Sequence, residues 1–173
     1  YTLVYTLSLH DALPIYCLQL ETAVTVPLAR ERAFALFVRK VQSWWPREYT
    51  WSRQVLQEFV IEPKVGGACY EIGALGFRCD WGHVVSYAEP EKIRFRWQIS
   101  PRREPVPDPD RAGEVEVRFL EESGGTRVSL VHRGFENHGR DGEWYRDAME
   151  SEMGWPKILD GYRRAAEEQD DGG

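Results

Sequence analysis

The segment KIRFRWQIS, residues 92–100, is the part of the sequence that decides the fold. Apolar and polar side chains alternate along its whole length, and the apolar series consists of Ile93, Phe95, Trp97 and Ile99. A period of two residues predicts a β-strand with one covered face, because successive side chains of a strand point to opposite sides of the sheet. Strands with this pattern are typical of antiparallel sheets that are packed on one face.

Further strands are predicted on both sides of this segment. The same alternation recurs in YCLQLETAVTV (16–26), EVEVRFL (114–120) and TRVSLVHRGF (126–135). Three other stretches have strand character, namely QVLQEFVIEP (54–63), GACYEIG (67–73) and FRCDWGHVVSY (77–87). Together these segments predict one curved antiparallel sheet of about six or seven strands.

Two details of the hairpin formed by residues 67–87 are expected from its residue types. Gly82 is expected to mark a β-bulge, which would change the inward face of the strand and leaves the orientation of His83 open. Glu71 and Arg78 are expected to face each other as a cross-strand ion pair, which is a structural role.

Helices are predicted near both ends of the chain. The segment ARERAFALFVRKV (29–41) has apolar residues at helical spacing, so we expect a short pair of helices between the first strand and Pro46. The closing segment predicts a short helix, a bend near Gly154 and a longer helix with Pro156 in its first turn. Helices at both ends of an antiparallel sheet define an α+β fold. One domain is expected over residues 16–168, with a frayed tail over 169–173.

Residues 1–15 are set apart from this domain. The decapeptide TLSLHDALPI (6–15) closely resembles the conceptual translation of a sequencing-adapter oligonucleotide, and a near-repeat of the letters YTL precedes it. We expect this leader to be foreign to the domain and disordered. The neighbouring His10 and Asp11 are therefore given no chemical role.

Composition and charge argue against several classes of function. The chain of 173 residues carries a formal net charge of −6, whereas proteins that bind nucleic acids or anionic membranes need a positive field. No apolar run approaches the length of a membrane span, and the three cysteines form no CxxC pair. We therefore expect a cytoplasmic protein with reduced thiols, no membrane span and no nucleic-acid partner.

Six fragments together resemble a known superfamily. They are WWP (44–46), GGACYE (66–71), CDWGHV (79–84), PEKIRFRWQI (90–99), TRVSLVHRGFE (126–136) and GWPKIL (154–159). In order and spacing they resemble the START-like SRPBCC superfamily, in its branch of homologues of the activator of the heat-shock-protein ATPase. The resemblance covers residues 18–165. It implies a helix-grip fold, in which a curved antiparallel sheet wraps around a long C-terminal helix with an apolar cavity between them.

The resemblance implies a small-molecule-binding domain that holds an apolar or amphipathic ligand in this cavity. Seven Trp, eight Tyr and seven Phe provide many rings for such a lining, although rings also fill ordinary cores. The aromatic connection QSWWPREYTW (42–51) is expected to close one end of the cavity, as a packed plug or as a gate. The residues expected to bind the ligand are Trp45, Trp81, Phe95, Trp97, His132, Phe135 and Trp155.

His132 is the one candidate for chemistry. By strand parity it shares the covered face with Val128 and Leu130, where a histidine is either a satisfied core residue or a polar group in the cavity. In the cavity it could act as the acid-base group of a cyclase or hydrolase, which is the alternative to binding without chemistry. A co-chaperone-like interaction with an unidentified protein partner is the further alternative.

No metal or cofactor site is predicted. The histidines lack HExxH spacing, and Gly66 and Gly67 lie in no GxGxxG or Walker pattern. No GxSxG segment exists, so a nucleophilic serine is not indicated. The sequence therefore favours a binding function over an enzymatic one.

Overall fold

The strands form one seven-stranded antiparallel sheet, as their alternation predicts. The computed structural model describes residues 18–172, so the leader at 1–15 lies outside the described residues. In chain order the strands are β1 (Gln19–Val26), β2 (Glu58–Ile61), β3 (Ala68–Ile72), β4 (Arg78–Ala88), β5 (Lys92–Trp97), β6 (Gly113–Glu122) and β7 (Gly125–Arg133). Across the sheet they follow the order β1-β7-β6-β5-β4-β3-β2, and each neighbouring pair is antiparallel.

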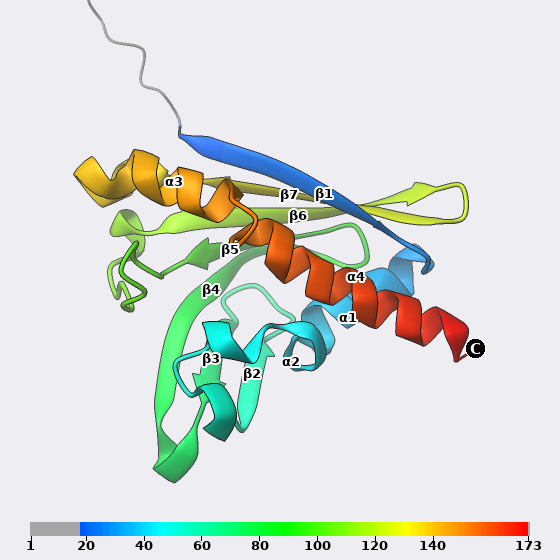
Figure 1. Cartoon of the computed structure of the whole chain (residues 1–173), viewed down its shortest axis with the longest axis horizontal. Helices are drawn as coiled ribbons and strands as arrows, with labels where there is room; N and C mark the ends of the chain where they lie inside the picture. Colours follow the sequence, from blue (N-terminus) through cyan, green and yellow to red (C-terminus); the bar gives the residue numbers. More distant parts are fainter. Residues whose placement is uncertain (1–17, 173) are drawn as a thin grey trace, which may run out of the picture.

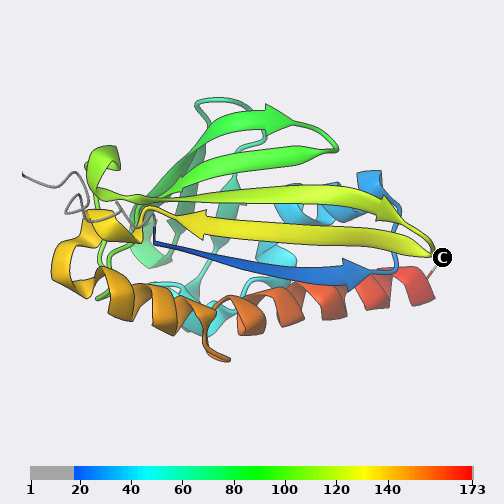
Figure 2. The ribbon, with the colours of Figure 1, turned by 90° about the horizontal axis from the view of Figure 1, so that it is seen from above.

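The helices pack against the inner side of this curled sheet. They are α1 (Arg30–Arg39), α2 (Val41–Trp44), α3 (Gly142–Glu150) and α4 (Trp155–Asp171). Short 3₁₀ turns are η1 (Arg47–Tyr49), η2 (Arg53–Val55), η3 (Ala74–Gly76), η4 (Pro109–Arg111) and η5 (Phe135–Asp141). Figure 1 shows α4 crossing in front of the sheet, and Figure 2 shows α3 and α4 following one another along it. This arrangement is the α+β helix-grip fold, so the expected fold class is confirmed.

β5 illustrates why the sheet has a covered face and an outer face. Its inward residues are almost completely buried, with exposed fractions of 0% for Ile93, 1% for Phe95 and 4% for Trp97. Burying one such side chain stabilises the fold by about 2 kcal/mol. On the outer face, Arg94 and Arg96 lie 3.7 and 3.9 Å from the carboxylate of Glu114 on β6. The alternation in the sequence is thus the alternation between core and outer surface.

β4 contains the bulge that Gly82 predicts. The register of β4 against β3 slips by one residue at Trp81, immediately before Gly82, which faces Cys69. As a result Trp81 points inward, whereas His83 is half-buried on the outer face, with its Nδ1 2.9 Å from Oε1 of Gln98. A Cβ atom at position 82 would lie 2.2 Å from a backbone carbonyl oxygen of β5. This close approach is the reason for the glycine.

The expected pair of short helices follows β1. α1 buries one apolar face, which consists of Ala33, Phe34, Leu36, Phe37 and Val38. The indole Nε1 of Trp44 donates a hydrogen bond to the carbonyl oxygen of Leu36 at 3.0 Å, which ties α2 back onto α1. Trp45 then has extended backbone angles, as the residue before Pro46 should. The helical segment therefore ends at Trp44, and the backbone is extended at Trp45.

Two helices separated by a bend close the fold, as Gly154 and Pro156 predict. α3 ends at Glu150, and α4 begins at Trp155 with Pro156 in its first turn. The hydroxyl of Tyr162 on α4 donates a hydrogen bond to the carbonyl oxygen of Ala33 on α1 at 2.7 Å. α4 continues through Asp171, so residues 169–171 of the expected tail are helical in the structure.

Candidate functional site

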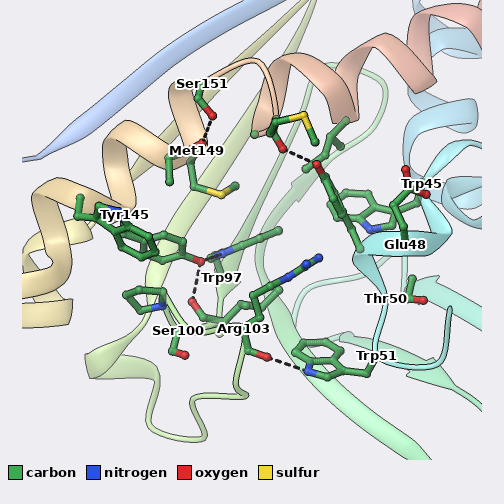
Figure 3. A pocket seen from close by; sticks show the side chains of 18 of the residues that line it. Trp45, Glu48, Thr50, Trp51, Trp97, Ser100, Arg103, Tyr145, Met149 and Ser151 are labelled. Atoms are coloured by element: carbon green, nitrogen blue, oxygen red, sulfur yellow. Dashed lines mark hydrogen bonds between the residues drawn. The ribbon is translucent and has the colours of Figure 1, made fainter.

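A pocket of about 550 Å³ opens where the end of β5 meets the bend between α3 and α4 (Figure 3). Three parts of the chain line it, within residues 45–53, 97–103 and 144–158. Its aromatic lining residues are Trp45, Tyr49, Trp51, Trp97, Trp144 and Tyr145. Its charged lining residues are Glu48, Arg53 and Arg103. A pocket of this volume is typical of sites for small organic molecules.

Trp97 at the end of β5 and Tyr145 on α3 form the inner wall. The indole Nε1 of Trp97 donates to the hydroxyl of Tyr145 at 2.8 Å, and that hydroxyl donates to the carbonyl oxygen of Ile99 at 2.9 Å. Burial raises the pKa of the Tyr145 hydroxyl well above its usual value. Because the hydroxyl both accepts and donates within the wall, Tyr145 holds α3 against the end of β5.

A buried carboxylate whose role at the pocket was not predicted from the sequence holds the opposite wall. Glu71 on β3 is completely buried, and it accepts hydrogen bonds from the amide of Trp51 at 3.1 Å and from the amide and Oγ of Ser52 at 2.8 and 2.7 Å. Three donors compensate the carboxylate for its lost water. The residues after Ser52 form the 3₁₀ turn η2, so β2 starts at Glu58 rather than at residue 54. The signal in the sequence is parity, because Glu71 shares its face with the buried Cys69.

The expected ion pair between Glu71 and Arg78 is wrong. In the observed register Glu71 faces Cys79, and Arg78 faces Ile72. Nε of Arg78 instead lies 2.8 Å from Oδ1 of Asp80. The hairpin turn is one residue longer than the sequence prediction assumed, and this difference frees Glu71 to bond to the pocket wall.

Hydrogen bonds tie the three lining segments together at the rim. Nε1 of Trp51 donates a hydrogen bond to the carbonyl oxygen of Arg103 at 2.8 Å. The hydroxyl of Tyr49 donates one to the carbonyl oxygen of Met153 at 2.6 Å. The guanidinium carbon of Arg103 lies 4.9 Å from the ring centre of Tyr49, and Nζ of Lys157 lies 5.0 Å from it. These contacts between distant segments hold the walls of the pocket together.

Two of the residues predicted to bind a ligand, Trp45 and Trp97, line the pocket. Four others are at most 1% exposed and pack in the core behind it, namely Trp81, Phe95, Phe135 and Trp155. Ring-centre distances of 5.9 Å from Trp81 to Trp97 and 5.1 Å from Trp155 to Trp97 connect this core to the pocket wall. A contact between the four buried rings and a ligand stays a prediction.

His132 lies in the core, and it is not a lining residue of the pocket. Its ring has no exposed surface, lies 4.2 Å from the ring centre of Phe135, and accepts a hydrogen bond at Nδ1 from Nε1 of Trp155 at 3.0 Å. Burial, and to a lesser degree the nearby His138, lowers the pKa of His132 to about 3. The imidazole is therefore neutral near pH 7. Its complete burial and its hydrogen bond from Trp155 are typical of a histidine with a structural role.

Sequence reasoning missed most of the pocket rim. Arg103 lies in a loop between β5 and β6, Trp144 on α3, and Met153 in the bend between the helices. Helical spacing indicates a helix at Trp144 but does not identify pocket residues, because these positions come together only when the two helices fold back over the end of the sheet. Tyr49 and Trp51 belong to the aromatic connection that was expected at one end of the cavity, and both line the pocket.

Within residues 18–172, no group of three or more His, Cys, Asp or Glu side chains is arranged to hold a metal ion. Among the helices of the same part of the chain, none combines the length and the hydropathy that crossing a membrane requires.

The fold and the pocket define the class of protein. A curled seven-stranded sheet closed by a long, bent C-terminal helical segment is the architecture of the START-like SRPBCC superfamily, a class that supports small-molecule binding in general. Residues 27–167 match the family described as "Activator of Hsp90 ATPase homolog 1-like protein". The chain belongs to this family, and the resemblance seen in the sequence is confirmed.

Several solved structures are similar to the chain. Txn09, described as an anthrahydroquino-γ-pyrone synthase, is 29% identical, with a TM-score of 0.60 over 84% of this chain and 95% of Txn09. CalC, a self-sacrificing resistance protein from Micromonospora echinospora, is 26% identical, with a TM-score of 0.60 over 87% of this chain and 95% of CalC. Protein NE0264 from Nitrosomonas europaea is 11% identical and shares the fold alone, with a TM-score of 0.60 over 88% and 96% of the two chains. No protein with a curated description matches the sequence.

Proposed function

We propose that this protein binds a planar aromatic small molecule in the pocket between the end of β5 and the bend of the C-terminal helices. The observation that carries the proposal is the pocket lining, in which four tryptophans and two tyrosines surround about 550 Å³. Aromatic rings bind flat apolar ligands well, because stacked or edge-to-face contacts add to the hydrophobic gain. The sequence predicted an apolar or amphipathic ligand. Because the largest side chains that line the pocket are aromatic, we narrow this ligand class to aromatic compounds.

One similar structure supports this choice of ligand. Txn09, which is 29% identical over 84% of this chain, is described as an anthrahydroquino-γ-pyrone synthase, a name that indicates a product with fused aromatic rings. The alternatives have less support. A cyclase or hydrolase that uses His132 needs open volume beside the imidazole, whereas the ring is fully buried. For a co-chaperone-like function, the geometry described above offers no specific argument.

A fluorescence titration tests the proposal, because four of the seven tryptophans line the pocket. The panel contains planar compounds of one, two and three fused aromatic rings, with decalin derivatives and a saturated fatty acid as shape controls. We expect saturable quenching by the planar compounds and little or none by the controls. No saturable response to any planar compound would contradict the proposal.

A pocket-filling variant locates the binding site. Ala148 on α3 lines the pocket and is half-buried, so Ala148→Phe places a ring in the cavity. We expect at least about tenfold weaker binding, which corresponds to about 1.4 kcal/mol. Ala165→Phe is the matched control, because Ala165 is a half-buried alanine on α4 that lines a different groove. Equal binding by both variants, with both folded by circular dichroism, would place the ligand elsewhere.

A further inference from the structure

Most neutral polar groups that line the pocket are already bonded within the protein; among the described residues, the indole Nε1 of Trp45 is a buried donor without a partner. The hydroxyls of Thr50 and Ser151 donate to backbone carbonyl oxygens at 2.7 Å, and Oγ of Ser100 accepts from two backbone amides. The hydroxyl of Tyr145 and the indole of Trp97 bond to each other. A ligand therefore finds few neutral polar groups that are free to recognise it.

The charged groups differ in this respect. Glu48 is paired with Lys157, with Oε1 and Nζ 2.9 Å apart. Arg53 and Arg103 form no ion pair with any residue of the part of the chain that the structure describes. The chain as a whole is acidic, with a formal net charge of −6, so two arginines without a carboxylate partner at one aromatic pocket contrast with the overall charge of the protein.

The structure holds Arg103 in place. Its backbone is in the left-handed region, with φ at 61°, which disfavours side chains other than glycine and needs support from the surroundings. Two hydrogen bonds provide that support. The backbone amide of Arg103 donates to the carbonyl oxygen of Ser100 at 2.9 Å, and Nε1 of Trp51 donates to the carbonyl oxygen of Arg103 at 2.8 Å. Figure 3 shows the guanidinium between the wall of Trp97 and Tyr145 and the wall of Trp51.

We propose that the ligand is an aromatic carboxylic acid, whose ring lies between the aromatic walls and whose carboxylate pairs with the guanidinium of Arg103. This inference rests on the proposed function and names the chemistry of its ligand. A guanidinium presents a planar fork of donors that matches a carboxylate, and such charge-assisted bonds are stronger than neutral ones. Tyr49 stacks on the guanidinium at 4.9 Å and restricts its position, which lowers the entropy lost on binding. Arg53 adds a second positive charge at the same pocket.

The test compares 2-naphthoate with 2-naphthalenemethanol, which have the same rings but differ in charge at pH 7.5. We expect the wild type to bind naphthoate about tenfold more tightly, with a preference that declines as NaCl is added. Arg103→Gln should remove most of the preference by weakening the binding of naphthoate more than that of the alcohol, and Arg103→Lys should retain more of the preference than Arg103→Gln. Arg102→Gln is the matched control, because Arg102 is an exposed arginine of the same loop that does not line the pocket.

The outcomes separate this inference from the proposed function. If the wild type binds the acid and the alcohol equally, or if Arg103→Gln weakens both alike, the assignment of the carboxylate to Arg103 is overturned while aromatic binding stands. If neither naphthalene compound binds but larger planar compounds of the panel do, the assignment again fails and the pocket keeps its proposed function. If no planar compound binds, both proposals fail.

Discussion

The imidazole of His132 occupies surroundings very different from water. Its ring has no exposed surface, and its Nε2 has no hydrogen-bond partner among the described residues. Adding a proton would place a positive charge among Trp155, Phe135 and other apolar groups, so burial lowers the pKa to about 3. The unfolded chain, in which the same histidine has a pKa near 6.5, accepts the proton readily.

This difference predicts how stability depends on pH. Between pH 6.5 and 3 the unfolded chain binds a proton that the folded chain excludes, so the free energy of unfolding falls as the pH falls. Above pH 6.5 the imidazole is neutral in both states and adds no pH dependence. From pH 7.5 to 5.0 we expect His132 to remove about 2 kcal/mol, measured by urea denaturation at each pH.

The control is His132→Asn, whose side-chain oxygen can still accept from Trp155 but which does not titrate. The pKa of His138 is also lowered, first by its own burial and second by the nearby Arg111. The effect of His132 is therefore the difference between the stability losses of the wild type and of His132→Asn over the same pH range. If the wild type and His132→Asn lose the same stability between pH 7.5 and 5.0, the histidine does not titrate as its burial requires.

At the scale of elements, α4 packs against the end of α2 at Gly161. A Cβ atom at this position would lie 2.7 Å from the carbonyl oxygen of Trp44, closer than side-chain carbon atoms approach an oxygen in folded proteins. Helix propensity alone favours alanine over glycine by about 1 kcal/mol. The two effects oppose each other, and the steric one is larger because the contact is with backbone, which cannot rotate away.

We therefore expect Gly161→Ala to lower the free energy of unfolding by about 2 kcal/mol, as overpacked cores do. Chemical denaturation monitored by circular dichroism measures it. Gly172→Ala provides the comparison, because a Cβ atom there would meet its nearest neighbour, the carbonyl oxygen of Glu168, at an ordinary 3.6 Å. A stability equal to or higher than that of the wild type for Gly161→Ala would mean that α4 and α2 are not packed in this way.

At the scale of the whole molecule, the pocket exists only because distant parts of the chain meet. Its lining comes from within residues 45–53, 97–103 and 144–158, and hydrogen bonds join all three at the rim. A ligand that contacts all three should therefore slow local opening in all three together. The hairpin between β6 and β7 lies at the other end of the molecule in both Figure 1 and Figure 2.

Hydrogen exchange measures this coupling. With a saturating planar ligand from the panel, we expect slower amide exchange in the three lining segments and unchanged exchange in residues 120–127 of the hairpin. Ala148→Phe mixed with the same ligand at the same concentration serves as the control and should show clearly weaker protection in all three segments. Protection confined to one segment would mean that the ligand sits on the surface and not between the walls.

Much of the fold was predictable from the sequence because its signals are local. Alternation along β5, β6 and β7 identified the strands and their inward faces, including His132, and the positions of Gly154 and Pro156 placed the bend between the last two helices. Gly82 correctly indicated the bulge in β4. Each of these features depends on the backbone geometry of a few consecutive residues, so a short window of sequence contains it.

What only the tertiary structure decided is which inward side chains meet open space. Parity places Trp81 and Trp97 on the same covered face, yet Trp97 lines the pocket and Trp81 is packed behind it. The difference comes from the curl of the sheet, the register of the hairpin that buries Glu71, and the loop that brings Arg103 to the rim. These are contacts between residues far apart in the chain. The sequence by itself therefore determined the strands, the helices and the side that faces the core, while the position and the charge of the pocket were set by long-range packing.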